Sequence, residues 1–296
     1  MTDLSSLAGN QIELDGLARY AAIVGTQPSK GARSPTLWNA AFAAHGVNAK
    51  MLPVDVTSDN LQQLLGVLDN DATFMGGAIA APYKEHVAQW LGPRLSAPAA
   101  RIGAVNCLYR GDDGHLAGTN TDGEAALTSF EATNGPVAGK RVLLLGAGGA
   151  GKAVAAYFAS ALERSGQLTI CTRSPAAETF ARSISAHWVD WSRLDAQLTN
   201  VDVIVNCTSV GWGTAVEESP LNAAQLAQLS QTATVFDIVY QPRPTQLLRS
   251  AAARGLRTFD GLAMNLAQAV LAFGYAMPGA APAITQAAMH AAAHSN

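Results

Sequence analysis

Charged side chains are scarce in this chain of 296 residues. Asp, Glu, Lys and Arg make up 14% of it, while 49% is hydrophobic, a balance that is typical of a folded globular protein. The formal net charge is −3, and Lys and Arg form no cluster. Nucleic-acid-binding surfaces usually carry such a cluster, so we expect no nucleic-acid partner.

Disulfide patterns, metal-binding patterns and long apolar runs are missing as well. The three cysteines (Cys107, Cys171 and Cys207) are widely separated, which predicts reduced core residues. His290 and His294 lie close together, but no acid or cysteine joins them, so we expect no metal site. No apolar run approaches the ~18 residues of a membrane span, and the N-terminus lacks the basic and apolar regions of a signal peptide. We therefore expect a cytoplasmic protein with no membrane partner.

The most informative stretch of the chain reads GKRVLLLGAGGAGKAVAAYFASAL, from Gly139 to Leu162. An apolar run gives way to glycines and then to an alanine-rich helical pattern, which predicts a strand, a tight turn and a helix. The glycines fit G-x-G-x-x-G, a pattern that allows a tight turn, close approach of a pyrophosphate and close packing of the helix. We therefore predict a dinucleotide-binding turn made of Gly146, Ala147, Gly148, Gly149, Ala150 and Gly151.

This turn has two other interpretations. Lys152 follows Gly151, which nearly matches the phosphate-binding pattern G-x-x-x-x-G-K-[ST]. Ala153 then stands where that pattern needs a hydroxyl for magnesium, so a kinase or ATPase is disfavoured. A closely packed strand and helix without any ligand remains the structural alternative.

The end of the next strand, Leu168 to Cys171, bears on the choice of cofactor. An acid at this place would bind the ribose 2′-hydroxyl of NAD, and the chain has none. It has Thr172, Arg173 and Ser174 instead, and a guanidinium binds phosphate in a bidentate manner. The sequence thus favours NADP, with NAD possible, unless Arg173 is only a solvated surface residue.

Strand-like and helical segments alternate along the whole chain. Strands are expected at 20–25, 47–56, from 74, and at 103–109, 142–145, 168–171, 187–189, 201–208 and 234–240; helices are expected from 35 and at 60–68, 85–91, 175–183, 222–229, 265–273 and 283–294. This alternation predicts an α/β fold with a parallel, doubly wound sheet. No linker is evident, so we expect two closely coupled lobes with a cleft between them.

Three polar residues at element junctions have structural explanations of their own. Ser34 fits the N-cap of a helix that begins near Pro35, although such a helix start can also bind an anion. Lys84, at a strand-to-helix junction, reads as a solvated charge. Asp122 lies inside a predicted capping box formed by Thr121 and Glu124, so periodicity alone makes it structural.

Taken together, the motifs resemble those of the shikimate dehydrogenase family along most of the chain and in the same order. The resemblance rests on GAVNCL (103–108), GTNTDG (118–123), GAGGAG (146–151), NCTSVG (206–211), DIVYQPRPTQLL (237–248) and GLAMNLAQA (261–269). It implies an N-terminal α/β substrate lobe (1–122) completed by the C-terminal helices (260–296), and a Rossmann lobe for NADP (123–259). It also implies reversible hydride transfer between nicotinamide and a small cyclic hydroxy acid such as shikimate.

The resemblance also implies roles for individual residues. Lys84 and Asp122 would flank the reacting hydroxyl as an acid/base pair, which replaces the structural interpretation of Asp122. The substrate would be bound by Ser34, Asn106, Tyr240 and Gln268. The cofactor would be bound, beyond the glycine turn and Thr172 to Ser174, by Thr208, Ser209, Val210 and Gly261.

The chain departs from the family pattern where the substrate would bind. The family has S-x-S-P and N-V-T-x-P-x-K, whereas Ala32, Ala78 and Ala80 stand at three of the polar positions. Ala177 replaces a second arginine near the NADP phosphate. We therefore expect weakened binding of shikimate. Quinate or aminoshikimate oxidation, and a non-catalytic nucleotide-binding regulatory protein, remain alternatives, and both monomer and homodimer remain open.

Overall fold

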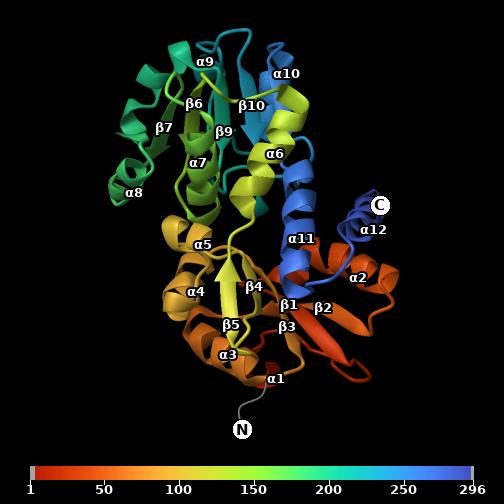
Figure 1. Ribbon diagram of the computed structural model, residues 1–296. Coiled ribbons are helices and arrows are strands. Elements are labelled where there is room, and N and C mark those ends of the chain that lie inside the picture. The colour runs from red at the N-terminus through yellow and green to blue at the C-terminus, as the bar shows by residue number, and fades with distance from the viewer. Residues whose placement is uncertain (1–3, 295–296) are drawn as a thin grey trace. The chain divides into compact units, whose positions relative to one another are not determined.

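Residues 4–294 are described by a computed structural model, and they form two compact units, each built around one β-sheet (Figure 1). The first unit takes the described residues up to Thr121 together with those from Leu266 onward, and the second is Asp122–Asn265. The chain therefore leaves the first unit once and returns to it near the end.

The sheet of the first unit has five strands in the order β2-β1-β3-β4-β5. They are β1 (Arg19–Gly25), β2 (Ala49–Asp55), β3 (Phe74–Ile79), β4 (Cys107–Arg110) and β5 (Leu116–Thr119). Its helices are α1 (Leu4–Leu7), α2 (Ser34–Ala44), α3 (Ser58–Asn70), α4 (Lys84–Leu91), α5 (Ala97–Ile102), α12 (Pro282–Ala293) and the later part of α11 (Leu262–Ala276). Short 3₁₀ turns occupy Pro28–Lys30 and Gly92–Arg94.

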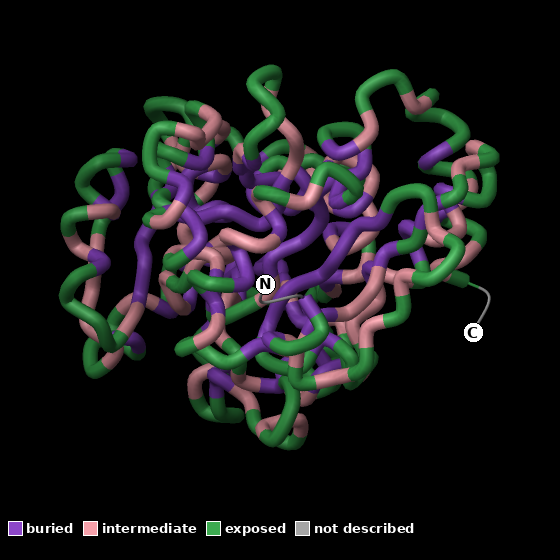
Figure 2. The backbone as a smooth tube through the Cα atoms, turned by 90° about the horizontal axis from the view of Figure 1, so that it is seen from below, coloured by how far each residue is buried: buried purple, intermediate pink, exposed green. Residues whose placement is uncertain are grey.

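Two apolar clusters form the core of this unit, and successive side chains of β1 contribute to them in turn. Ala22 and Val24 belong to the cluster that contains the buried leucines of α3, whereas Ala21 and Ile23 belong to the cluster of Trp38, Phe42 and Phe273. Such alternation follows from the two-residue period of a strand. Figure 2 shows buried segments running through the interior of the backbone trace and exposed segments mostly at its outside.

The sheet of the second unit has six strands in the order β11-β10-β9-β6-β7-β8, and every pair in it is parallel. The strands are β6 (Arg141–Leu145), β7 (Gln167–Thr172), β8 (His187–Asp190), β9 (Val203–Asn206), β10 (Thr234–Asp237) and β11 (Arg257–Asp260). The helices are α6 (Asp122–Asn134), α7 (Gly149–Ala161), α8 (Ala177–Ser183), α9 (Ala223–Leu226) and α10 (Gln246–Ala253), with 3₁₀ turns at Trp191–Arg193, Asp195–Asn200 and Gly213–Ala215.

The strand order of the second sheet reverses direction between β6 and β9. From β6 the chain proceeds to β7 and β8 on one side, and then returns to β9 on the other side. Ligands of open parallel sheets bind at the carboxyl ends of the strands on either side of this reversal. Those ends are Leu145 and Asn206, which are paired in register.

The first sheet is mixed, because β4 pairs antiparallel with both β3 and β5; the short turn at residues 111–115 allows only a hairpin. Two expectations about local structure are wrong. Ser34 is not a helix N-cap: the N-cap is Arg33, whose side chain caps nothing, and Ser34 is the first helical residue. The strand expected at 103–109 begins only at Cys107, so Asn106 lies just before it.

Helix length decides whether a helix could cross a membrane. α11, with 15 residues, is shorter than the ~20 residues that cross a bilayer. Within residues 4–294, no helix is both long and apolar enough to span a membrane.

Candidate functional site

The glycine turn follows β6 directly, and packing determines two of its glycines. Gly146 has a φ of +91°, which favours glycine, and its N–H donates to Cys171 O at 2.9 Å. A Cβ on Gly151 would lie 2.4 Å from Gly146 O, so only glycine lets α7 start this close to β6. These two glycines are explained by the close-packed crossing alone.

Gly148 is different, because nothing in the protein explains it. It has a φ of −74°, which any residue can adopt, and a Cβ built on it would meet no atom within 4 Å. It is also exposed and is the N-cap of α7, with no side chain to satisfy the first N–H groups of the helix. An open position before a 13-residue helix fits a pyrophosphate that approaches the backbone.

Thr172, Arg173 and Ser174 lie beside this turn, at the carboxyl end of β7. The two places are linked because Gly146 is bonded to Cys171, the residue before Thr172. Ser174 N–H donates to Thr172 Oγ1 at 3.4 Å, which forms a tight turn, and Arg173 is exposed. A guanidinium is thus available on the side of the turn where the 2′-phosphate of NADP would lie.

On the other side of β6, the loop after β9 packs on the glycine turn. A Cβ on Gly146 would lie 2.9 Å from Thr208 Cγ2. Asn206 Oδ1 accepts hydrogen bonds from Thr208 N at 3.0 Å and from Thr208 Oγ1 at 2.7 Å. Thr208 Oγ1 in turn accepts from Val210 N at 3.1 Å, which holds residues 208–210 in one conformation.

A buried carboxylate lies behind this loop. Asp237 is 0% exposed, and it accepts hydrogen bonds from Asn206 Nδ2 at 2.9 Å, Val239 N at 3.1 Å and Thr245 Oγ1 at 2.7 Å. Burial raises the pKa of Asp237 to about 6, although these hydrogen bonds lower it in part. Burial, together with the nearby carboxylates of Asp237 and Asp122, raises the pKa of the Cys207 thiol well above its ordinary value.

In the first unit, a second polar cluster joins three segments that are distant in the sequence. Asn106 Nδ2 donates to Thr121 Oγ1 at 2.9 Å and to Gln268 Oε1 at 3.3 Å, while Asn106 Oδ1 accepts from Thr121 N at 2.8 Å. Thr121 Oγ1 also contacts Gln268 O at 3.2 Å. Lys84 belongs to the same neighbourhood, because its carbonyl accepts from the N–H of Val105 at 2.9 Å.

The three alanines that stand at polar positions of the family pattern belong to the apolar core of the first unit. Ala78 is buried within the cluster of Trp38 and Phe273, and the partly buried Ala32 and Ala80 pack against the same cluster. Ser34, at the start of α2, is 5% exposed. The three alanines therefore supply no polar group where the family pattern has one.

Comparison with known proteins decides the family. The shikimate dehydrogenase substrate-binding domain matches residues 23–108, and shikimate/quinate 5-dehydrogenase matches residues 126–253. A shikimate dehydrogenase (NADP(+)) from Thermosynechococcus vestitus is 34% identical over 274 residues, which cover 91% of this chain and 94% of that protein. The chain belongs to the shikimate dehydrogenase family.

Solved structures of this family's fold are similar to the chain over nearly its whole length. Shikimate 5-dehydrogenase from Thermus thermophilus, in complex with NADP(H) and shikimate, has a TM-score of 0.76 and 30% identity, covering 93% of this chain and 100% of that one. A ligand-free 5-ketofructose reductase of a Gluconobacter species has a TM-score of 0.73 and 27% identity, covering 93% and 99%. The expected α/β fold with a Rossmann unit is confirmed.

The residues expected in the site of a shikimate dehydrogenase fall into both units. The first unit contains Ser34, Lys84, Asn106 and Gln268, and it brings Asn106 and Gln268 into contact. The second contains Asp122, which is 5% exposed at the start of α6, and the half-buried Tyr240. Since Lys84 and Asp122 belong to different units, their pairing stays a prediction.

The remaining cofactor residues lie at the carboxyl edge of the second sheet. Ser209 is exposed and Val210 half-buried in the loop after β9. Gly261, which follows β11, is explained by packing, because a Cβ on it would lie 2.1 Å from Ile238 O. Sequence reasoning missed Thr121, Asn206, Asp237 and Thr245 as parts of polar networks, although each lies in or beside a motif that carries the family resemblance.

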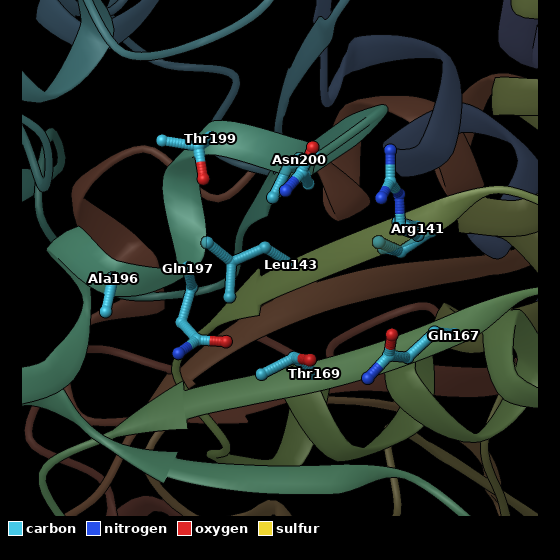
Figure 3. A pocket seen from close by; sticks show the side chains of 10 residues that line it. Arg141, Leu143, Gln167, Thr169, Ala196, Gln197, Thr199 and Asn200 are labelled. Atoms are coloured by element: carbon cyan, nitrogen blue, oxygen red, sulfur yellow. The ribbon is translucent and has the colours of Figure 1, made fainter.

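A pocket of about 260 Å³ lies elsewhere in the second unit (Figure 3). Its lining includes Arg141 and Leu143 from the first three residues of β6, and Gln167 and Thr169 from the first three residues of β7. This is the edge of the sheet opposite to the glycine turn. None of the residues that the family resemblance implicates lines this pocket.

Proposed function

We propose that the protein is an NADP-dependent shikimate dehydrogenase, which transfers hydride reversibly between the nicotinamide and a ring hydroxyl of shikimate or a closely related cyclic hydroxy acid. The main observation in support of this proposal is the polar cluster of Asn106, Thr121 and Gln268 beside Lys84. A relative of the chain is named for this reaction. Such a cluster of amides and a hydroxyl suits hydrogen bonds to ring hydroxyls.

The cofactor site of the second unit is consistent with this proposal. The open backbone at Gly148 and the start of α7 suit the pyrophosphate, and Arg173 suits the extra phosphate of NADP. NADP would supply the hydride acceptor when bound. No acid follows β7 to repel the phosphate, because the strand is followed by Arg173 and Ser174.

Lys84 is proposed as the general acid/base. Oxidation of a secondary alcohol requires that a proton leave the oxygen as hydride departs from the carbon, and reduction requires the proton's return. An amine at hydrogen-bond distance from the oxygen can perform both steps. Asp122 would orient this amine.

The alanines predict a change in substrate preference. If two to three polar contacts to shikimate are missing, and each is worth about 0.5–1.5 kcal/mol, shikimate binds about fivefold to about 2,000-fold more weakly than in a family member that has them. Ala32, Ala78 and Ala80 instead form part of an apolar cluster. The similarity to a 5-ketofructose reductase supports a changed substrate preference on this fold.

The test is steady-state kinetics with shikimate, quinate and related ring alcohols, with NADP⁺ and with NAD⁺. Lys84→Ala should lower kcat by about 10²- to 10⁴-fold, while calorimetry shows that the substrate still binds. Lys50→Ala, at an exposed position on β2, is the matched control and should keep normal kinetics.

Full activity of Lys84→Ala would refute its role, and absence of turnover with every substrate would favour the non-catalytic alternative. A lower KM for NAD⁺ than for NADP⁺ would contradict the cofactor assignment.

A further inference from the structure

Asp237 contributes nothing to hydride transfer as proposed above, yet the fold keeps its carboxylate fully buried. Its three hydrogen-bond partners, the Asn206 amide, the Val239 N–H and the Thr245 hydroxyl, are all neutral. A buried carboxylate without a cation is costly, and burial raises its pKa to about 6. Groups with such perturbed pKa values cluster at functional sites.

The Asp237 carboxylate determines which group donates and which accepts in the hydrogen bonds of Asn206 and Thr208. An ionised carboxylate only accepts, so the NH₂ end of the Asn206 amide must face it and the Oδ1 end must face Thr208. Oδ1 then accepts from both the N–H and the hydroxyl of Thr208. The Thr208 hydroxyl thus donates its proton to Asn206, and its oxygen accepts from Val210 N.

This chain of hydrogen bonds ends at the glycine turn. Asn206 and Asp237 are the last residues of β9 and β10, and they are paired in register at the edge where parallel sheets bind ligands. The Thr208 methyl group packs where Gly146 would carry a Cβ. The conformation of residues 208–210 and their position against the turn therefore depend on one orientation of the Asn206 amide.

We propose that Asp237 is a positioning residue for the cofactor, which acts through Asn206 to hold the Thr208–Val210 loop against the glycine turn. Thr245 supports Asp237 from the start of α10, where its hydroxyl also caps Leu248 N at 3.4 Å. The inference rests on the proposed function, since it assumes that this edge binds NADP.

Calorimetric titration with NADP⁺ tests the inference without any need for turnover. In Asp237→Asn, an NH₂ group replaces one acceptor, so at least one of the three donors loses its partner. The Kd for NADP⁺ should rise at least about tenfold, while the KM for the ring substrate at saturating NADP⁺ stays within about twofold. Asp202→Asn, at the opposite, amino end of β9, is the matched control and should bind NADP⁺ normally.

A second pair of variants covers the case in which Asp237→Asn does not fold. Thr245→Val removes the hydroxyl that donates to Asp237 and should weaken NADP⁺ binding severalfold, whereas Thr245→Ser keeps this hydroxyl and should restore binding. An unchanged Kd in folded Asp237→Asn, or equal affinities of Thr245→Val and Thr245→Ser, would overturn the inference. Failure of the wild-type chain to bind NADP⁺ would instead overturn the proposed function.

Discussion

The three glycines of this turn differ in whether the fold requires them. Gly146 has a left-handed φ that favours glycine, and at Gly151 a Cβ would overlap neighbouring atoms. Neither reason applies to Gly148. The pattern G-x-G-x-x-G in the sequence does not distinguish these reasons, but the structure does. A substitution at Gly151 should affect stability, whereas one at Gly148 should affect only the binding of the cofactor.

Alanine substitutions at Gly148 and Gly151 should change different quantities: NADP⁺ affinity at Gly148 and stability at Gly151. Gly148→Ala should change the free energy of unfolding by less than about 0.5 kcal/mol, because its Cβ meets no atom, but should weaken NADP⁺ binding at least about tenfold. Gly151→Ala should destabilise the protein by about 1–3 kcal/mol, because its Cβ would overlap Gly146 O. Urea unfolding and calorimetry measure the two quantities. Normal NADP⁺ affinity of Gly148→Ala would show that the pyrophosphate does not lie at this turn.

The Asp237 carboxyl predicts an unusual dependence of stability on pH. Its pKa of about 6 lies above the ordinary value of 3.8, so between these values the folded state binds a proton that the unfolded state has released. Stability should therefore fall as the pH rises from about 4 to about 6, by about 3 kcal/mol in total. Asp69 and Asp71 have lowered pKa values, because hydrogen bonds outweigh the effect of burial, so their contributions are lost only at lower pH.

Thermal unfolding of the wild type and of Asp237→Asn at several pH values measures this effect. The fall in Tm between pH 4 and pH 6 should be present in the wild type and absent in the variant. A parallel pH dependence of both proteins would show that Asp237 has an ordinary pKa.

At the scale of elements, one arginine joins the end of a helix to a hairpin. α3 ends at Asn70, and the guanidinium of Arg110 on β4 donates to the carbonyls of Leu68 and Asp69 at 2.7 Å each. It also donates to the carbonyls of Phe74, Asp71 and Gly114. The last carbonyls of a helix have no partner inside it, so Arg110 satisfies acceptors that would otherwise be unpaired.

Lysine should not replace arginine at this position. An ammonium has three donors on one nitrogen and cannot reach five carbonyls, so Arg110→Lys should lower the free energy of unfolding by about 1–3 kcal/mol. Arg19→Lys, at the exposed first residue of β1, is the control and should be neutral. The urea midpoint measures both. Equal midpoints for the two variants would mean that water satisfies the carbonyls as well as Arg110 does.

Elements with strong local patterns could be predicted from the sequence, and those that depend on distant partners could not. The apolar run of β6 and its glycines specify a strand and a turn by themselves. β11, by contrast, reads RTFD and is partly exposed, so its sequence lacks the apolar run of a buried strand. The cluster of Asn106, Thr121 and Gln268 joins residues up to 162 positions apart, and no local pattern reports such contacts.

At the scale of the molecule, the end of the chain completes the unit in which the chain began. α12 packs on α2: Met289 is 0% exposed within the cluster of Trp38 and Phe273, and His45 bonds to Thr285 at 2.9 Å. The Arg33 guanidinium in the loop before α2 donates to Ala293 O at 2.8 Å. The core of the first unit and the start of α2, where Ser34 lies, therefore both depend on the last helix.

This dependence predicts that a core substitution in α12 acts on the first unit and not on the second. Met289→Ala should cost about 2–5 kcal/mol, since it leaves a cavity among aromatic rings, whereas Ile284→Ala, at a position that is 47% exposed on the same helix, should cost little. Hydrogen exchange should accelerate in β1, β2 and β3 and stay unchanged in β6, β7 and β9, because the two sheets have separate cores. NADP⁺ affinity should likewise stay unchanged while the KM for the ring substrate rises. Equal acceleration of exchange in both sheets would contradict this prediction. It would mean that the two units unfold together as one cooperative unit.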